Sequence, residues 1–251
     1  MLANVYARSE MIHDALYVLN QMDSLNMEAS ISTYDSLMYN VRTSDVMSDL
    51  YGGIRARGVS YSPYSHNIFI DGLCKQRRFG EAICCFQELR ARKELRPCTV
   101  TFNTLMSGLC NTGYVDVAAK LFVGMMLKYG LVPDRFSYAS LVHGLSIAGR
   151  MEEALEFCED MERVGIEPDV VTYNILINGF RILGLMNWVW RFVREMILKG
   201  LEPDLVTYTI LITGHCESGS VDVGMRIKEG DACTRISIKY CHLQCAPECS
   251  E

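Results

Sequence analysis

The chain of 251 residues lacks features that mark several common classes of protein. It has no apolar run close to the roughly 18 residues of a membrane span, no glycine-rich phosphate loop and no long period-two alternation. Basic residues (24) are fewer than acidic residues (30), which leaves a formal charge of −6. These deficits argue against a membrane protein, a P-loop enzyme, a β-rich fold and a strongly electrostatic binder of nucleic acid.

The chain does contain a repeat with a step of 35 residues. Glu-Pro-Asp followed by a Val-Thr-Tyr run occurs twice, and three sets of residues keep the step: Tyr138, Tyr173 and Tyr208; Asp134, Asp169 and Asp204; and Gly144, Gly179 and Gly214. A repeat of this length is typical of arrays in which one structural unit stacks on the next, because a single unit cannot bury its own apolar face.

These landmarks divide nearly the whole chain. The predicted units are a partial repeat (1–30), a short repeat (31–62), four full repeats (63–98, 99–134, 135–169 and 170–204), a partial last repeat (205–228) and a Cys-rich irregular tail (229–251). Two full repeats carry one extra residue each, which we place in turns at Lys93–Glu94 and Lys128–Tyr129. No targeting peptide is recognised, because the first residues already match a repeat interior, so a truncated or longer natural product is expected.

Each full repeat is predicted to form two helices. In repeat 170–204 the first apolar stripe is Tyr173, Leu176, Ile177 and Phe180, and the second is Trp188, Phe192 and Met196. Gly184 separates them, and Gly200 with Pro203 ends the second. The same pattern in repeat 135–169 predicts that Ala154, Phe157 and Met161 are buried. The sequence therefore predicts an all-α solenoid of stacked helix-turn-helix units.

Cysteines and histidines give no catalytic or metal site. Seven cysteines lie within the repeats and are interpreted as packing residues in a reducing compartment: Cys74, Cys84, Cys85, Cys98, Cys110, Cys158 and Cys216. The tail holds Cys233, Cys241, Cys245, Cys249 and His242 without Cys-x-x-Cys pairing. We prefer to interpret it as a tail translated from sequence that did not evolve as protein, such as a read-through intron, rather than as a metal site. The five histidines occupy unrelated repeat positions. We therefore expect no enzyme, no cofactor, no metal, no small-molecule substrate and no membrane partner.

The repeat resembles the pentatricopeptide repeat family, pure class, plant organellar type, over about residues 1–228. The resemblance rests on Asp169-Val170-Val171-Thr172-Tyr173-Asn174, Gly179, Met196, Gly200 and Pro203-Asp204 in this order. Tetratricopeptide repeats would place tryptophan early in the first helix, but Trp188 and Trp190 lie in a second helix. The resemblance implies a right-handed superhelix with first helices lining its groove. It also implies single-stranded RNA binding at one base per repeat in a mitochondrion, or alternatively a chloroplast, for transcript processing, stability or translation, alongside other RNA-processing proteins.

The resemblance also implies which residues read the bases. A reading pair is the residue after the first-helix aromatic and the last residue of the repeat: Asp35 with Ser62, Asn67 with Cys98, Asn103 with Asp134, Ala139 with Asp169, Asn174 with Asp204, and Thr209 with an unassigned partner. The residues that would pack on the bases are Ser32, Tyr64, Val100, Phe136, Val171 and Val206. By family analogy an Asn/Asp pair reads uracil, so the predicted target is N-N-U-N-U, read 5′ to 3′ along the chain.

Other interpretations of these residues remain open. Asp169 and Asp204 precede helices and suit a helix N-cap, a role that can coexist with base reading. Late in the first helices, phosphate contacts are available only at Arg8 and Lys75, so binding is expected to be weak and salt-dependent. The other basic residues gather in one repeat: Arg77, Arg78, Arg90, Arg92, Lys93 and Arg96. A protein–protein scaffold and a truncated fragment with little activity are the alternatives.

Overall fold

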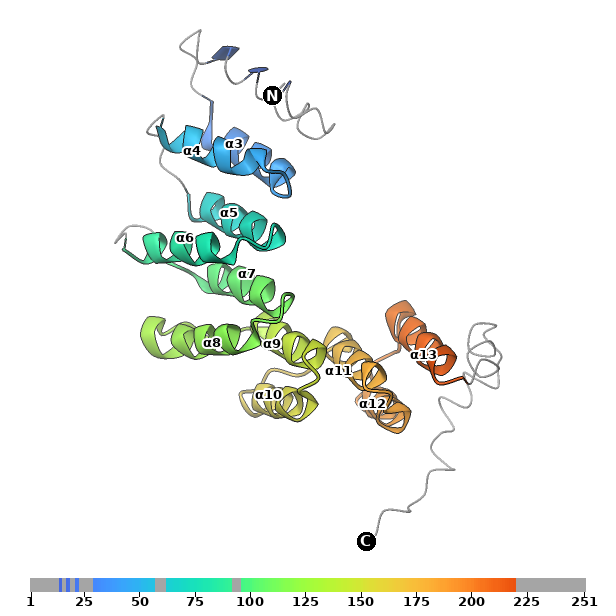
Figure 1. Ribbon diagram of the computed structural model, residues 1–251. Helices are drawn as coiled ribbons and strands as arrows, with labels where there is room; N and C mark the ends of the chain where they lie inside the picture. Colours follow the sequence, from blue (N-terminus) through green and yellow to red (C-terminus); the bar gives the residue numbers. More distant parts are fainter. Residues whose placement is uncertain are drawn as a thin grey trace. The chain divides into compact units, whose positions relative to one another are not determined.

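The structure is a computed structural model that describes residues 14, 17–18, 21–22, 29–56, 62–91 and 96–219. Within these residues it contains helices and no strand (Figure 1). The helices are α3 (Ile31–Val41), α4 (Val46–Ala56), α5 (Pro63–Lys75), α6 (Phe79–Ala91), α7 (Thr99–Cys110), α8 (Val115–Tyr129), α9 (Arg135–Ile147), α10 (Met151–Arg163), α11 (Val170–Ile182), α12 (Met186–Leu198) and α13 (Leu205–Glu217). No described helix is long and apolar enough to span a membrane.

The chain divides into two compact units. Helices α3 to α7 and most of α8 form the first, and α9 to α13 belong to the second. Within each unit, first helices pack on the first helices of neighbouring repeats: α3 on α5 and α5 on α7, then α9 on α11 and α11 on α13. The first helices α5, α9 and α11 also pack on the second helices of their own hairpins, α6, α10 and α12 (Figure 1). This confirms the predicted all-α stack of hairpins.

Polar N-caps fix the start of the first helices. The side chains of Ser30, Ser62, Asp134, Asp169 and Asp204 each accept a hydrogen bond from the backbone amide three residues further on. Such a cap satisfies one of the amides left unbonded at a helix start and stabilises the helix by about 1 kcal/mol. The expectation that Asp169 and Asp204 act as caps is therefore confirmed.

The apolar stripes predicted from the sequence form the core of the second unit. Tyr173, Leu176, Ala154 and Met161 are buried as predicted. Burial of a large apolar side chain of this kind stabilises the fold by about 1.5–3 kcal/mol. Phe157 is only partly buried and packs against the edge of the core, whereas its neighbour Cys158 is buried. The prediction for Phe157 was wrong because the buried stripe of α10 passes through Met151, Ala154, Cys158 and Met161.

Glycines in first helices permit close packing on the preceding repeat. A Cβ atom at Gly179 would lie 2.5 Å from Met151 Sδ and 3.0 Å from Ser146 Cβ. The same clash recurs at Gly214, where a Cβ would lie 2.8 Å from Met186 Sδ. Methionine at the start of the second helix thus covers the glycine of the next first helix, which explains why both residues recur at the repeat step.

One detail of the helix ends departs from the sequence predictions, and a second was not foreseen. Lys128 and Tyr129 do not lie in a turn, because α8 continues to Tyr129 and is 15 residues long, whereas α10 has 13. The extra residue is therefore absorbed in the helix. Between α5 and α6, Arg77 has a φ of 60°, the left-handed conformation that Gly184 (φ 71°) holds at the equivalent position. The other predicted insertion, at Lys93–Glu94, lies outside the described residues.

The interpretation of the repeat cysteines as packing residues holds for only some of them. Cys74, Cys85, Cys110 and Cys158 are buried, and burial raises the pKa of the Cys110 thiol to about 12. Cys84, Cys98 and Cys216 are exposed, so the packing interpretation is wrong for these three. Cys98 precedes α7 as its N-cap, and Cys84 lies on the exposed side of α6. The tail at residues 229–251 and its metal-binding alternative lie outside the described residues.

Candidate functional site

The most complete reading pair joins α11 to the start of α13. Asn174 Nδ2 donates to Asp204 Oδ1 at 3.0 Å, and Thr207 Oγ1 donates to Asn174 Oδ1 at 2.6 Å. Asn174 is only 7% exposed, and its placement facing the groove lined by first helices stays a prediction. It is buried between consecutive first helices rather than inside its own hairpin, because its hydrogen-bond partners are Asp204, the N-cap of α13, and Thr207 within α13. Asp204, by contrast, is exposed.

Asp204 caps a helix and orients Asn174 at the same time. Its Oδ1 atom accepts from Asn174 Nδ2, from the backbone amide of Thr207 at 2.9 Å and from Thr207 Oγ1 at 3.0 Å. Hydrogen bonds from the Thr207 backbone, and then from the Asn174 and Thr207 side chains, lower the pKa of the Asp204 carboxyl although burial opposes them. The carboxylate thus fixes the orientation of the Asn174 amide, with its nitrogen towards Asp204 and its oxygen towards Thr207.

A hydroxyl residue just before the first-helix aromatic supports each of these pairs and was missed in the sequence predictions. Ser65, Thr101, Ser137, Thr172 and Thr207 are all buried. Thr172 Oγ1, for example, donates to Asp169 Oδ1 at 3.0 Å, as Thr207 Oγ1 does to Asp204. The recurrence of Ser or Thr before the aromatic was visible in the sequence and is the signal that could have identified this position.

The pair Ala139/Asp169 has a different arrangement. Ala139 has no polar side chain, and Asp169 instead lies 3.5 Å from the guanidinium of Arg135, measured from Oδ2 to Nη1. Arg135 is the first residue of α9, and Asp169 is the last residue of the same repeat. An arginine therefore supplies a positive charge at this pair, and the sequence pattern gave no indication of it.

The pair Asn103/Asp134 is divided between the two compact units, and each residue is described within its own unit. Asn103 is 4% exposed and is therefore buried like Asn174. Asp134 is exposed and caps α9, where its Oδ1 accepts from the Ser137 backbone amide at 2.9 Å. Both asparagines of the predicted uracil-reading pairs are therefore buried, and both aspartates are exposed N-caps.

The remaining pairs lie in the first unit. Asn67 is partly buried and Cys98 is exposed at the start of α7. Burial opposes ionisation of Cys98, but hydrogen bonds from Thr101, from the Val100 backbone and from Asn67 lower the pKa of its thiol. Asp35 is buried, and its Oδ1 accepts from Ser65 Oγ at 2.5 Å. Ser62 Oγ lies 3.5 Å from the other oxygen of Asp35, so this predicted pair is also in contact.

The residues predicted to pack on bases are exposed. The five apolar members lie two residues before a first-helix aromatic and are more than half exposed: Tyr64 58%, Val100 57%, Phe136 56%, Val171 59% and Val206 53%. The sixth, Ser32, and the unassigned Thr209 are exposed as well. Exposed apolar side chains at one repeat position, each in the same helix as a reading residue, suit contact with the flat faces of bases.

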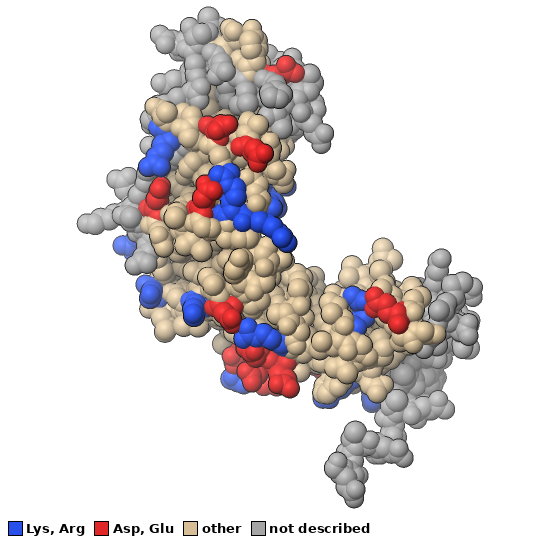
Figure 2. Space-filling view, in the orientation of Figure 1, with Lys and Arg blue, Asp and Glu red and all other residues tan. Residues whose placement is uncertain are grey.

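Charged side chains at this surface are largely paired with each other. Lys75 Nζ lies 2.6 Å from Asp71, and Arg78 Nε lies 2.7 Å from Glu81. Acidic side chains gather over α10, the helix that carries Glu152, Glu153, Glu156, Glu159, Asp160 and Glu162 (Figure 2). These charged residues are therefore expected to attract a polyanion only weakly. Arg8, Arg92 and Lys93 lie outside the described residues, and nothing is stated of the Arg90 side chain.

Two of the three described histidines, His66 and His215, are held in side-chain contacts. His66 is 2% exposed, with its ring 6.1 Å from that of Tyr51 in an edge-on arrangement. His215 Nε2 lies 3.2 Å from Trp190 Nε1, and burial lowers the pKa of its imidazole. Among the described residues, no group of three or more His, Cys, Asp or Glu side chains is placed to bind a metal ion.

Sequence models of one family match most of the chain. A model described as the PPR repeat family matches residues 97–147 and 133–181, and two models described as PPR repeat match residues 64–93, 171–201 and 199–229. A putative pentatricopeptide repeat-containing protein of Arabidopsis thaliana is 40% identical over 104 residues, which are 41% of this chain and 12% of that protein. A mitochondrial member from the same plant is 30% identical over 141 residues, 56% of this chain and 24% of that protein. The chain thus matches a minor part of these relatives.

Solved structures show the same fold. The pentatricopeptide repeat protein PPR10 from maize aligns with a TM-score of 0.64 at 19% identity, over 96% of this chain and 39% of that one. PPR10 in complex with an 18-nt psaJ RNA element aligns with a TM-score of 0.60 at 23% identity, over 90% of this chain and 38% of that one. At sequence identities of 19% and 23%, the structural similarity to PPR10 establishes the fold alone.

Proposed function

The chain belongs to the pentatricopeptide repeat family, and on this basis we propose that it binds single-stranded RNA sequence-selectively, with one base per repeat. The constant step of 35 residues from repeat 135–169 to repeat 170–204 supports the pure class. The RNA complex of maize PPR10, which shares the fold, supports RNA as the ligand. Relatives named as mitochondrial and chloroplastic support a role in organellar RNA processing, stability or translation.

The observation that carries the proposal is the fixed amide of Asn174. Asp204 holds the amide nitrogen and Thr207 holds the amide oxygen, and Val171 lies exposed one helical turn earlier. A rigid polar group beside an exposed apolar side chain can discriminate base edges while the apolar side chain contacts the base face. Because Asn174 is buried, a base contacts the edge of the cluster, chiefly through the exposed Asp204.

The proposed role is recognition rather than catalysis. His66 and His215 are used in packing contacts with Tyr51 and Trp190, which leaves neither arranged beside a nucleophile. Lys75, already bonded to Asp71, is proposed as a phosphate contact of modest strength. The repeat boundaries and the reading residues named above form part of this proposal.

The test is binding of the full chain to fluorescent N-N-U-N-U RNA, with the fifth base varied. We expect uracil to be preferred there, and Asn174→Thr to shift the preference towards guanine. The matched control is Asn187→Thr, which makes the same change at an exposed position of α12 in the same hairpin. Affinity should also fall as salt rises, because counterion release contributes to binding of single strands. Equal affinity for poly-A and uracil-containing RNA, unchanged by Asn174→Thr, would contradict the proposal and favour a protein scaffold or an inactive fragment.

A further inference from the structure

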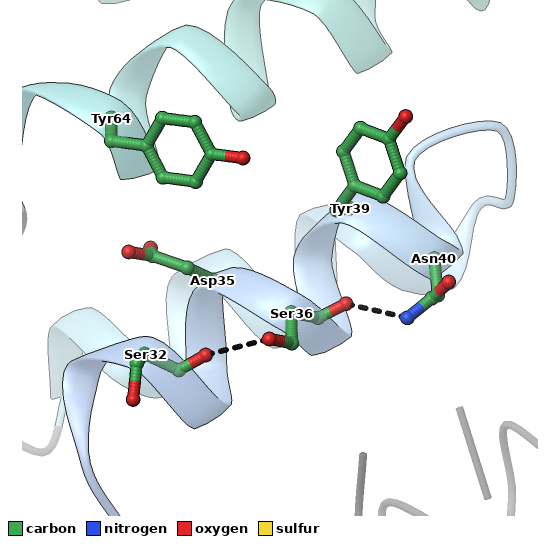
Figure 3. Close-up of a pocket in the computed structure, with 6 residues that line it drawn as sticks. All are labelled: Ser32, Asp35, Ser36, Tyr39, Asn40 and Tyr64. Atoms are coloured by element: carbon green, nitrogen blue, oxygen red, sulfur yellow. Dashed lines mark hydrogen bonds between the residues drawn. The ribbon is translucent and has the colours of Figure 1, made fainter. Parts of the chain in front are cut away.

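A pocket of about 460 Å³ opens between α3 and α5 in the first unit. It is lined by Ser32, Asp35, Ser36, Tyr39, Asn40 and Tyr64 (Figure 3). Its volume falls in the range of about 300–1,000 Å³ that is usual for small-ligand sites. Five of its residues belong to α3, the first helix of one repeat, and Tyr64 belongs to α5, the first helix of the next. The inference below concerns this pocket and rests on the proposed RNA binding.

Asp35 lines the pocket with a carboxylate, whereas Asn67, Asn103 and Asn174 place an amide at the equivalent position of their repeats. Asp35 Oδ1 accepts from Ser65 Oγ at 2.5 Å, and Ser62 Oγ lies 3.5 Å from Oδ2. The two hydroxyls therefore hold Asp35 much as Asp204 and Thr207 hold Asn174. A carboxylate has about four acceptor positions and no donor, so both oxygens keep the capacity to accept hydrogen bonds from a ligand.

The base edges differ in how well they match such an acceptor. Guanine presents two neighbouring donors, N1–H and the N2 amino group, which can meet the two oxygens of one carboxylate. Adenine and cytosine present one amino donor beside a ring nitrogen that is itself an acceptor, and uracil presents one N–H between two carbonyls. An acceptor facing a carboxylate is repelled. We propose that the Asp35 pocket selects guanine, so that the target becomes G-N-U-N-U.

Tyr64 provides a surface on which the base can stack. Its side chain is 58% exposed, and its ring lies over the same side of α3 as the Asp35 carboxylate (Figure 3). Tyr39 lies at the other end of the pocket, but the Arg42 guanidinium is placed 3.9 Å from the centre of its ring and covers one face. Tyr64 is therefore the stacking residue, and Arg42 brings a positive charge to the end of the pocket occupied by Tyr39.

The experiment compares four RNAs, G-, A-, C- and U-N-U-N-U, for binding to the full chain by fluorescence anisotropy. Guanine at the first position should bind about 5- to 150-fold more tightly than the other bases, the range for a two-point base contact. Replacing guanine by inosine, which keeps N1–H and lacks the N2 amino group, should remove most of this preference. Because inosine changes only the RNA, this arm does not depend on the folding of any variant.

Protein variants identify the residues that carry the preference. Asp35→Asn should abolish the preference for guanine, whereas Asp49→Asn, which removes the same charge from an exposed position of α4, should leave it unchanged. Tyr64→Ala should weaken binding of every base about 5- to 150-fold, the range for loss of one stacked aromatic, and Tyr64→Phe should restore it.

The outcomes separate the two proposals. If the chain binds RNA with uracil preference at the fifth position but treats G, A, C and inosine alike at the first, guanine selection is wrong and RNA reading stands. Unchanged guanine preference in Asp35→Asn would also overturn the assignment to this pocket. If no RNA is bound, the proposed function itself fails.

Discussion

Replacement of Thr207 by valine tests the hydrogen-bonded cluster at the start of α13. Valine keeps the size and β-branching of threonine but has no hydroxyl. Thr207 is fully buried, and its hydroxyl donates to Asn174 Oδ1 at 2.6 Å and accepts from the Asp204 backbone amide at 3.2 Å. The substitution therefore leaves a buried carbonyl oxygen of Asn174 and a helix-start amide without their partner.

The expected magnitude follows from these contacts. A buried polar atom left without a partner costs about 1–3 kcal/mol, whereas loss of an ordinary hydrogen bond costs about 0.5–1.5 kcal/mol. Thr172→Val is the matched control, because Thr172 is equally buried but its hydroxyl donates only to Asp169 Oδ1, at 3.0 Å, among the hydrogen bonds between described residues. Asp169 also retains the Thr172 amide and Arg135 as partners. Thr207→Val should therefore lower the free energy of unfolding by about 1 kcal/mol more than Thr172→Val.

Two measurements check this prediction. Urea denaturation followed by far-UV circular dichroism gives the loss of stability for both variants. RNA binding with the fifth base varied gives the loss of uracil preference, which should occur in Thr207→Val because the Asn174 amide is no longer fixed. Equal destabilisation by the two variants, together with an unchanged base preference in Thr207→Val, would refute the idea that Thr207 positions Asn174.

Two further predictions concern stability. Arg77→Gly should stabilise the chain by up to about 1 kcal/mol in urea denaturation, because glycine adopts the left-handed backbone (φ 60°) without the steric cost borne by arginine; Arg78→Gly, which removes the ion pair with Glu81, should not stabilise it. The lowered pKa of Asp204 means that its contribution is present above the unfolded pKa of about 3.9 and is lost as pH falls through the folded value. Asp204→Asn should therefore lose less stability than the wild type between neutral pH and pH of about 3, and an identical pH dependence would contradict the role of this carboxylate.

The sequence was a good guide to the elements of the fold because each element depends on local pattern. Apolar spacing located the helices, glycine located the turn at Gly184, and the residue before each first helix located the caps, including Asp169 and Asp204. The glycine at the repeat step, such as Gly179, was also visible, although the reason for it, contact with Met151 of the preceding repeat, was not.

The chain by itself therefore determined the repeat step and the two helices of each repeat, since these follow from periodicity within about 35 residues. The reading positions were inferred from the family resemblance and stay a prediction. Only the tertiary structure decided how polar side chains are shared between repeats. Asn174 is buried because Asp204 and Thr207, some 30 residues later, close over it, and Asp35 lines a pocket because Tyr64 of the next repeat lies across from it. Such contacts join residues that are far apart in sequence, and periodicity records which residues recur but not which atoms meet.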